Sequence, residues 1–182
     1  MLFDLDETLV HTLSSNICDF YDEKEEIYVE GNGGIKTYFV NIRPYSKQIL
    51  HNLSKYHEFE LGVFTASEKE YADKIIKILD PEDKIFSLRY YRHHCENTEK
   101  YFTKNLSALK YLSLTHTVLI DNSPFSYLHQ PENAIPVLPF LYEKDDDQLK
   151  KLEQFLIKHI YDKNKLRSFD VRKILKSYFK LA

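Results

Sequence analysis

Short apolar runs alternate along the chain with stretches in which apolar residues recur every three or four positions. Compact apolar runs are typical of buried strands, and the longer spacing is typical of helices with one apolar face. The runs predict strands at Met1–Leu5, Phe59–Phe64, Ile85–Tyr91, Val118–Ile120 and Ala134–Val137. The spacing predicts helices near Tyr45–Tyr56, from about Ser67 to Leu79, around Leu106–Leu112, from about residue 146, and over Val171–Tyr178. Because strands alternate with helices, we expect an α/β fold with a three-layer, doubly wound parallel sheet.

One segment interrupts this alternation. Two apolar stretches, Ile27–Val29 and Tyr38–Val40, flank Gly31-Asn32-Gly33-Gly34, whose residues tolerate the positive φ values of tight turns. The pattern predicts a small β-hairpin insertion over about residues 12–41.

Several residues mark the expected ends of helices. Pro44 suits the first turn of a helix, and Ser67 or Thr65 suits the N-cap of the next one. Asp80-Pro81 is expected to end that helix. The acidic run Asp145–Asp147 suits the start of a helix because the helix dipole favours negative charge there. We interpret these residues as structural.

Length and composition limit the classes of protein that the chain can represent. At 182 residues and 43% hydrophobic content, we expect one domain over residues 1–182, with C-terminal helices over about 146–180. A net charge of −3 argues against direct nucleic-acid binding. No apolar stretch approaches the roughly 18 residues that cross a bilayer, and no secretory signal opens the chain. The expected location is intracellular, in the nucleus or the cytoplasm.

The first apolar run is short for a central strand, because only three residues precede Asp4. We therefore expect the natural protein to extend upstream, where an anchoring segment could stand.

The two cysteines, Cys18 and Cys95, are far apart in the sequence, as is common in a reducing compartment. A cysteine phosphatase loop needs Arg six residues after the cysteine, where Lys24 and Tyr101 stand instead. His93-His94-Cys95 has no second ligand pair at zinc spacing, which disfavours a zinc site.

Two aspartates stand two residues apart at the end of the first apolar run, in Phe3-Asp4-Leu5-Asp6-Glu7-Thr8. In an extended backbone Asp4, Asp6 and Thr8 share one face and can converge. Two carboxylates this close do not both ionise comfortably without a cation between them. The pair indicates a divalent ion such as Mg²⁺, which prefers oxygen ligands. It also permits one carboxylate to act as nucleophile and the other as proton donor.

This motif also has two simpler interpretations. Aspartate and threonine after an apolar run can cap a helix. A calcium loop is excluded, because Leu9 and Ser15 stand where such a loop needs Gly and Glu.

Other polar residues close the remaining predicted strands. Thr65 ends the second strand and Asp121-Asn122 ends the fourth, while Lys104 lies in a loop that can reach the same edge. Ligands bind outside the carboxyl ends of the strands in an open parallel sheet. Separately, these residues can be a helix cap, a turn and a solvated lysine. Together with Asp4 and Asp6 they predict one site.

This set resembles the haloacid dehalogenase (HAD)-like phosphotransferases, and within them the FCP/SCP/Dullard-type small carboxy-terminal-domain phosphatases. The stretches that carry the resemblance cover nearly the whole chain: Asp4-Leu5-Asp6-Glu7-Thr8-Leu9-Val10-His11, Ile42-Arg43-Pro44, Phe64-Thr65-Ala66-Ser67, Tyr71-Ala72-Asp73, Lys104-Asn105-Leu106-Ser107, Leu119-Ile120-Asp121-Asn122-Ser123-Pro124 and Asp170-Val171-Arg172.

The resemblance implies a Mg²⁺-dependent protein serine/threonine phosphatase that acts on a phosphorylated protein or peptide. Asp4 would be the nucleophile that becomes an aspartyl-phosphate. Asp6 would protonate the leaving oxygen and then serve as base for the hydrolytic water. Thr65 and Lys104 would hold the equatorial phosphoryl oxygens, whose charge must be stabilised in the transition state.

The resemblance also implies the remaining contacts of the site. Mg²⁺ would be held by Asp4, the backbone carbonyl of Asp6, Asp121 and Asn122. The residues implied in substrate binding are Thr8, Arg43, Tyr71 and Arg92. For Tyr71 and Arg92, a core aromatic residue and a surface charge are alternative interpretations.

The size of the insertion bears on substrate access. Under thirty residues that form a hairpin are too few for a helical cap, so the site should stay open and suit an extended phosphopeptide. A small-molecule phosphatase and a catalytically silent binding module, like the mitochondrial import receptors of this family, are the alternatives. The silent relatives lack the aspartate pair that Asp4 and Asp6 provide here.

One departure concerns substrate choice. Relatives that bind proline-rich polymerase tails line a pocket with apolar residues, where this chain has Ser14 and Glu68. A charged group in such a pocket would be costly to desolvate. We therefore expect a different sequence preference.

Overall fold

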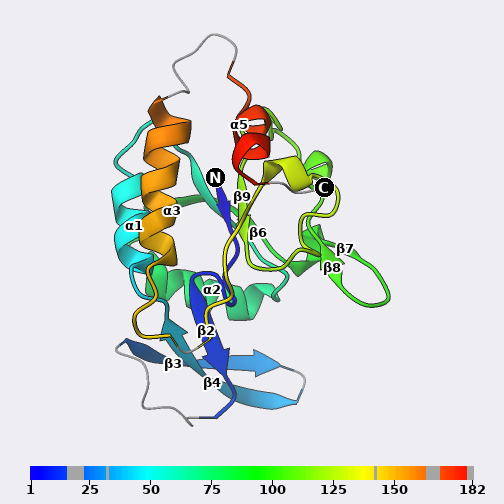
Figure 1. Cartoon of the computed structure of the whole chain (residues 1–182). Coiled ribbons are helices and arrows are strands. Elements are labelled where there is room, and N and C mark those ends of the chain that lie inside the picture. Colours follow the sequence, from blue (N-terminus) through cyan, green and yellow to red (C-terminus); the bar gives the residue numbers. More distant parts are fainter. Residues whose placement is uncertain (16–22, 32, 142, 163–168, 180–182) are drawn as a thin grey trace.

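The computed structural model describes residues 1–15, 23–31, 33–141, 143–162 and 169–179. At its centre lies a five-stranded sheet in the order β10-β9-β1-β5-β6 (Figure 1). These strands are β1 (Leu2–Phe3), β5 (Leu61–Phe64), β6 (Phe86–Tyr90), β9 (Leu119–Asp121) and β10 (Ala134–Pro136). Every neighbouring pair runs parallel. The predicted α/β fold with a central parallel sheet is confirmed.

The strands lie close together around β1. Leu2 pairs with Gly62 on one side and with Leu119 on the other. A Cβ atom added to Gly62 would lie 2.7 Å from the Cβ of Leu88 and 2.9 Å from the side chain of Leu2. Glycine is therefore required in β5 for the sheet to pack in this way.

Four of the five expected helices are present: α1 (Ser46–Leu53), α2 (Lys69–Leu79), α3 (Gln148–Phe155), which continues as the π-helical η4 (Leu156–Tyr161), and α5 (Val171–Tyr178). The first three begin later than predicted, whereas α5 has the predicted bounds. Figure 1 shows α1 and α3 side by side against the sheet. No described helix is long and apolar enough to cross a membrane.

The helix expected around Leu106–Leu112 is wrong. Only a short 3-10 turn, η2 (Leu106–Ala108), forms there. The side chain of Asn105 accepts a hydrogen bond from the backbone N–H of Ser107 at 3.1 Å, and the backbone becomes extended again at Leu109. Asn side chains compete in this way with the helical backbone for hydrogen bonds.

The helix ends agree only in part with the predictions. Asp80 ends α2 as expected. The predicted cap by Ser67 or Thr65 is wrong, because the N-cap of α2 is Glu68 and its side chain makes no capping hydrogen bond. The hydroxyl of Ser67 is instead donated to the carboxylate of Asp6 at 2.7 Å.

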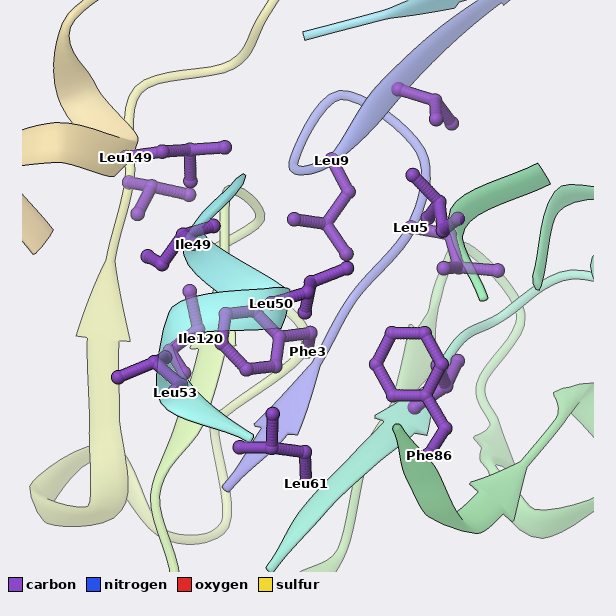
Figure 2. Close-up of a cluster of buried hydrophobic side chains, with 14 of the residues drawn as sticks. Phe3, Leu5, Leu9, Ile49, Leu50, Leu53, Leu61, Phe86, Ile120 and Leu149 are labelled. Carbon is purple, nitrogen blue, oxygen red and sulfur yellow. The ribbon is translucent and has the colours of Figure 1, made fainter. Parts of the chain in front are cut away.

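The two faces of the sheet carry separate apolar clusters, as alternating side chains require. Phe3, Val63, Ile120 and Ile135 belong to the larger cluster, which includes the apolar faces of α1, α2 and α3. Figure 2 shows Ile49, Leu50 and Leu53 of α1 gathered with Phe3, Leu61 and Ile120. The opposite face uses Leu2, Phe64, Leu119 and Ala134, covered by Leu106, Leu109 and Tyr127. The sheet is thus buried on both sides.

The predicted hairpin insertion is confirmed and is part of a larger sheet. Strands β3 (Lys24–Gly31) and β4 (Gly34–Ile42) pair antiparallel, and Gly34 adopts φ 102° at the turn. A third strand, β2 (Val10–Leu13), pairs with β4. In Figure 1 this blue sheet lies below the central sheet, next to α2. A further antiparallel pair, β7 (Glu96–Asn97) and β8 (Phe102–Thr103), lies to the right of the central sheet in Figure 1.

Of the two cysteines, Cys95 is described and is not part of a disulfide, whereas Cys18 lies outside the described residues.

Candidate active site

Asp4 follows β1 directly, and its backbone N–H is donated to the carbonyl of Ile120 at 2.9 Å. This bond continues the pairing of the central strand, so the carboxylate leaves the carboxyl edge of the sheet. There it accepts a hydrogen bond from Nζ of Lys104 at 2.6 Å. The same ammonium lies 2.6 Å from Oδ2 of Asp121, which ends the neighbouring strand β9. Asp4 and Asp121 thus meet through the ammonium of Lys104, which stands 100 residues after Asp4.

Lys104 follows β8 and is almost fully buried, with 1% of its surface exposed. Burial alone would lower the pKa of its ammonium, but the carboxylates of Asp121 and Asp4 raise it above the ordinary value. Lys104 therefore stays charged. Its backbone N–H is donated to the carbonyl of Ser126 at 2.7 Å, which fixes this segment against the loop after β9.

The pKa of Asp4 is raised as well, which for a carboxyl group favours the neutral form. Burial raises the pKa of its carboxyl to about 8, with a smaller contribution from the negative charges of Asp121 and Asp6, although the attraction of Lys104 opposes the shift. A buried carboxylate next to two others calls for more positive charge than a single lysine supplies. That need is what a divalent cation satisfies.

The chain turns sharply after Asp4. Backbone N–H groups of Thr8, Leu9 and Val10 are all donated to the carbonyl of Leu5, and Glu7 adopts φ 56°. Asp4 and Asp6 therefore face the same cavity, while Thr8 turns toward β9. Its hydroxyl is donated to Oδ1 of Asn122 at 3.2 Å. The three residues do not line one extended face, which corrects the expectation from their spacing.

Asp6 lines the same cavity as Lys104 and is held by two hydroxyl groups. Ser67 donates to its Oδ2 at 2.7 Å, and the phenol of Tyr71 donates to its Oδ1. The Tyr71 oxygen also lies 2.7 Å from the hydroxyl of Thr12. Burial and the negative charge of Asp6 raise the pKa of Tyr71 far above its ordinary value, so the phenol remains a donor.

Thr65 and Asp121 are buried at the ends of their strands. The Thr65 hydroxyl accepts the backbone N–H of Ser67 at 3.0 Å, and Oδ1 of Asp121 accepts the N–H of Ser123 at 2.8 Å. Both bonds form tight turns that fix the side chains at the edge of the sheet.

These groups line one open cavity of about 290 Å³. Its wall includes the residues expected at the site: Asp4, Asp6, Thr65, Arg92, Lys104, Asp121 and Asn122. The predicted convergence at the carboxyl ends of the strands thus agrees with the geometry.

The donor set suits Mg²⁺. The described residues contain no cluster of three His, Cys, Asp or Glu side chains placed to hold a metal. The expected donors are of a different kind, because they are two carboxylates, an amide oxygen and a backbone carbonyl. Lys104 engages one oxygen of each carboxylate, and Thr8 orients the amide of Asn122. Hard oxygen donors that leave room for water are what Mg²⁺ prefers, so the residues present fit this ion.

Arg43 does not line the cavity, which argues against the expected contact with substrate. Its guanidinium is buried and donates to both carboxylate oxygens of Asp146, at 2.9 and 2.7 Å, and to the carbonyl of Thr8 at 3.0 Å. Thr8 is likewise buried and contacts Asn122. Both side chains are buried outside the lining of the cavity and stabilise its residues, so we do not expect them to contact a ligand.

Tyr71 and Arg92 lie at the open side. Tyr71 lines a second, larger groove of about 1000 Å³, and Arg92 lines both cavities. Arg92 donates to the carbonyl of Ala66 at 2.6 Å and to Glu68 at 2.9 Å. Both residues are accessible to a ligand at this edge.

Sequence reasoning missed two parts of the site. Ser67 was interpreted as a helix cap, although its hydroxyl contacts Asp6. The aromatic side chains of Tyr101, Phe102 and Phe125, which line the outer wall of the cavity, were not singled out. They stand close to Lys104 and to Asp121 in the sequence, but an aromatic residue at such a position is equally typical of the core.

Comparison with known proteins places the chain in a family. The sequence profile of the NLI interacting factor-like phosphatases matches residues 1–167. The chain is 37% identical to nuclear envelope morphology protein 1 of Schizosaccharomyces pombe, over 89% of this chain and 34% of that protein. It is 38% identical to a probable C-terminal domain small phosphatase of Dictyostelium discoideum, over 84% and 47%.

A solved structure agrees in fold. The fission yeast RNA polymerase II CTD phosphatase Fcp1, bound to beryllium fluoride, superposes with a TM-score of 0.78 at 18% identity, covering 97% of this chain and 69% of that one. The chain spans from a third to about half of the length of the first curated relatives that it matches. With 167 of 182 residues matched by the profile, the chain belongs to the NLI interacting factor-like phosphatases, within the FCP/SCP branch of the HAD-like proteins.

Proposed function

We propose that this chain, as one domain, is a Mg²⁺-dependent protein serine/threonine phosphatase that acts through an aspartyl-phosphate on Asp4. The observation that carries the proposal is the buried bridge from Lys104 to Asp4 and Asp121, with Asp6 facing the same cavity. Nucleophile, cation and proton carrier are thereby within reach of one phosphoryl group.

In the first step, a carboxylate oxygen of Asp4 attacks phosphorus. The bond from phosphorus to the serine or threonine oxygen breaks, and Asp6 supplies the proton that this leaving oxygen needs. Ser67 and Tyr71 orient Asp6 through their hydroxyl groups. These two contacts hold the carboxyl group of Asp6 in one orientation, from which it can transfer its proton to the leaving oxygen.

In the second step, Asp6 removes a proton from water. The oxygen of that water attacks phosphorus, the bond to Asp4 breaks, and inorganic phosphate leaves. Lys104 and Thr65 are placed to hold the phosphoryl oxygens, whose charge is spread in the transition state. Bound Mg²⁺ would supply further positive charge there, held by Asp4, Asp121, Asn122 and the backbone carbonyl of Asp6.

The groove next to the site favours a polypeptide substrate over a small molecule. It lies between the β2–β4 sheet and α2, measures about 1000 Å³, and shares Asp6, Glu7, Ser67 and Arg92 with the catalytic cavity. A three-stranded sheet beside the cavity leaves its mouth open. An extended peptide can therefore run from the cavity into the groove.

The groove lining does not favour the proline-rich sequence of a polymerase tail. Ser14 and Glu68 both line it, together with Glu30 and Glu70. Buried apolar contacts with proline rings would require these polar groups to lose water. We therefore do not transfer that substrate from the relatives to this chain.

The names of the relatives suggest two settings, the RNA polymerase II tail and the nuclear envelope. Both lie inside the cell. We infer an intracellular location, in the nucleus or the cytoplasm.

Turnover of phosphoserine and phosphothreonine peptides should be compared with that of sugar phosphates, each with Mg²⁺ and with EDTA. We expect Mg²⁺-dependent hydrolysis of the peptides and little of the sugar phosphates. Faster hydrolysis of sugar phosphates would contradict the protein substrate. A folded wild type that hydrolyses no phosphoester would favour a silent binding module.

A further inference from the structure

Two aromatic rings form part of the wall of the catalytic cavity. Tyr101 and Phe125 are stacked, with ring centroids 4.6 Å apart and an interplanar angle of 21°. Both line the cavity that also contains Asp4 and Lys104. Phe125 keeps 49% of its surface exposed although its ring is already covered on the side of Tyr101. The catalytic cavity thus has an apolar wall on this side.

The rings are fixed relative to the catalytic groups. Tyr101 stands three residues before Lys104, and Phe125 stands four residues after Asp121. The two segments are joined by the hydrogen bond from the Lys104 N–H to the Ser126 carbonyl at 2.7 Å. The distance from the rings to the phosphoryl position is therefore set by the same contacts that hold Lys104 and Asp121.

A phosphoserine has a short side chain, so its backbone must come close to the mouth of the cavity when its phosphoryl group reaches Asp4. Consecutive residues of an extended peptide are roughly 3.3–3.6 Å apart. The side chains on either side of the phosphoserine must then lie along the walls of the mouth. One of them meets the wall that Tyr101 and Phe125 form.

We propose that Tyr101 and Phe125 select substrates that carry an apolar side chain within two residues of the phosphorylated serine or threonine. The proposal rests on the proposed phosphatase function and adds a substrate preference to it. Contact with the exposed face of Phe125 removes apolar surface of both partners from water. An aromatic side chain at this position would in addition stack on the ring or meet it edge to face.

A series of phosphoserine peptides tests this preference. The parent peptide has glycine at the two positions on each side of the phosphoserine, and leucine replaces each glycine in turn. For wild type, we expect leucine at one of these positions to raise kcat/KM about five- to tenfold. In Phe125→Ala and Tyr101→Ala, this gain should disappear, so that the ratio of kcat/KM for the leucine peptide to that for the all-glycine peptide falls to about one.

Tyr111→Ala is the matched control, because Tyr111 is fully exposed and lies beside a different cavity near Met1 and Val118. It should keep the gain from leucine. Equal losses on all peptides in Phe125→Ala would show that the rings only hold the loop, and would overturn the inference. A gain that persists in both variants, or no gain at any position in wild type, would also overturn it. Absence of turnover with every peptide would refute the proposed function itself.

Discussion

Arg43 and Asp146 lie 103 residues apart in the sequence and form a buried ion pair through two hydrogen bonds, at 2.9 and 2.7 Å. The third contact of the guanidinium is the carbonyl of Thr8, in the turn that separates Asp6 from β2. The backbone of Arg43 and the hydroxyl of Ser46 both donate to the next carbonyl, that of Leu9. The pair thereby ties the start of α3 to the turn beside Asp4 and Asp6, the aspartates proposed as catalytic.

Replacing Asp146 by Asn should therefore lower the free energy of unfolding by about 3 kcal/mol, because a buried guanidinium loses its counter-ion. Chemical denaturation gives this value directly. Glu82→Gln is the control, because its pair with Lys84 is fully exposed and its loss should leave the free energy of unfolding nearly unchanged. Similar effects of the two substitutions would contradict the structural role of the Arg43–Asp146 pair.

Thr8 should affect the metal rather than the chemical step. Its hydroxyl orients the amide oxygen of Asn122, one of the proposed Mg²⁺ ligands. In Thr8→Val we expect the Mg²⁺ concentration for half-maximal activity to rise about tenfold, with little change in kcat at saturating Mg²⁺. Thr8→Ser keeps the hydroxyl and should stay close to wild type. An unchanged Mg²⁺ requirement in Thr8→Val would refute this role.

Lys104 is expected to contribute to both stability and catalysis. In Lys104→Met, Asp4 and Asp121 remain buried together without the ammonium between them. We expect the thermal midpoint in EDTA to fall below that of wild type, and Mg²⁺ to restore much of the difference by supplying the missing charge. Activity should fall about 10²–10³-fold even at saturating Mg²⁺. Full activity in this variant would exclude Lys104 from the reaction.

Asp80 gives a prediction on pH. Burial would raise the pKa of its carboxyl, but hydrogen bonds from the backbone N–H groups of Lys84, Ile85 and Phe86, at 2.9, 2.9 and 3.1 Å, lower it below the ordinary 3.8. The folded state therefore favours the charged form, and this contribution is fully present above about pH 3.8. It is lost as the pH falls through the lower pKa of the folded state.

Wild type should accordingly be more stable than Asp80→Asn by about 1–3 kcal/mol between pH 5 and 7. The difference should shrink below about pH 3.8, as measured by urea unfolding at each pH. A difference that grows on acidification would contradict the lowered pKa of Asp80.

The parts of the fold that depend on local pattern were predictable. The apolar runs located all five strands of the central sheet, and the parallel arrangement placed Asp4, Thr65 and Asp121 at one edge. Lys104 was expected at the same edge, where it bridges two carboxylates. These expectations required only strand order and the direction of the chain.

Contacts between distant segments were not predictable in the same way. Nothing near Arg43 in the sequence indicates that its partner is Asp146, so its guanidinium was expected at the substrate. Asp145–Asp147 was rightly interpreted as structural, but for the helix dipole and not for this ion pair. The apolar spacing of Leu106, Leu109 and Leu112 predicted a helix, although the Asn105 side chain directs the backbone into a short 3-10 turn. The partner of Arg43 depends on a contact between distant segments, and the 3-10 turn depends on competition between the Asn105 side chain and the helical backbone.

The most direct test of the proposed mechanism compares wild type with Asp4→Asn. Both proteins are mixed with a ³²P-labelled phosphopeptide, with Mg²⁺ or EDTA, and quenched in acid after times shorter than one turnover. We predict acid-stable label on wild type in the presence of Mg²⁺, together with release of phosphate. In folded Asp4→Asn, the label should be absent and turnover lower by at least about 10³-fold. Turnover close to wild type in Asp4→Asn would contradict the assignment of Asp4 as the nucleophile.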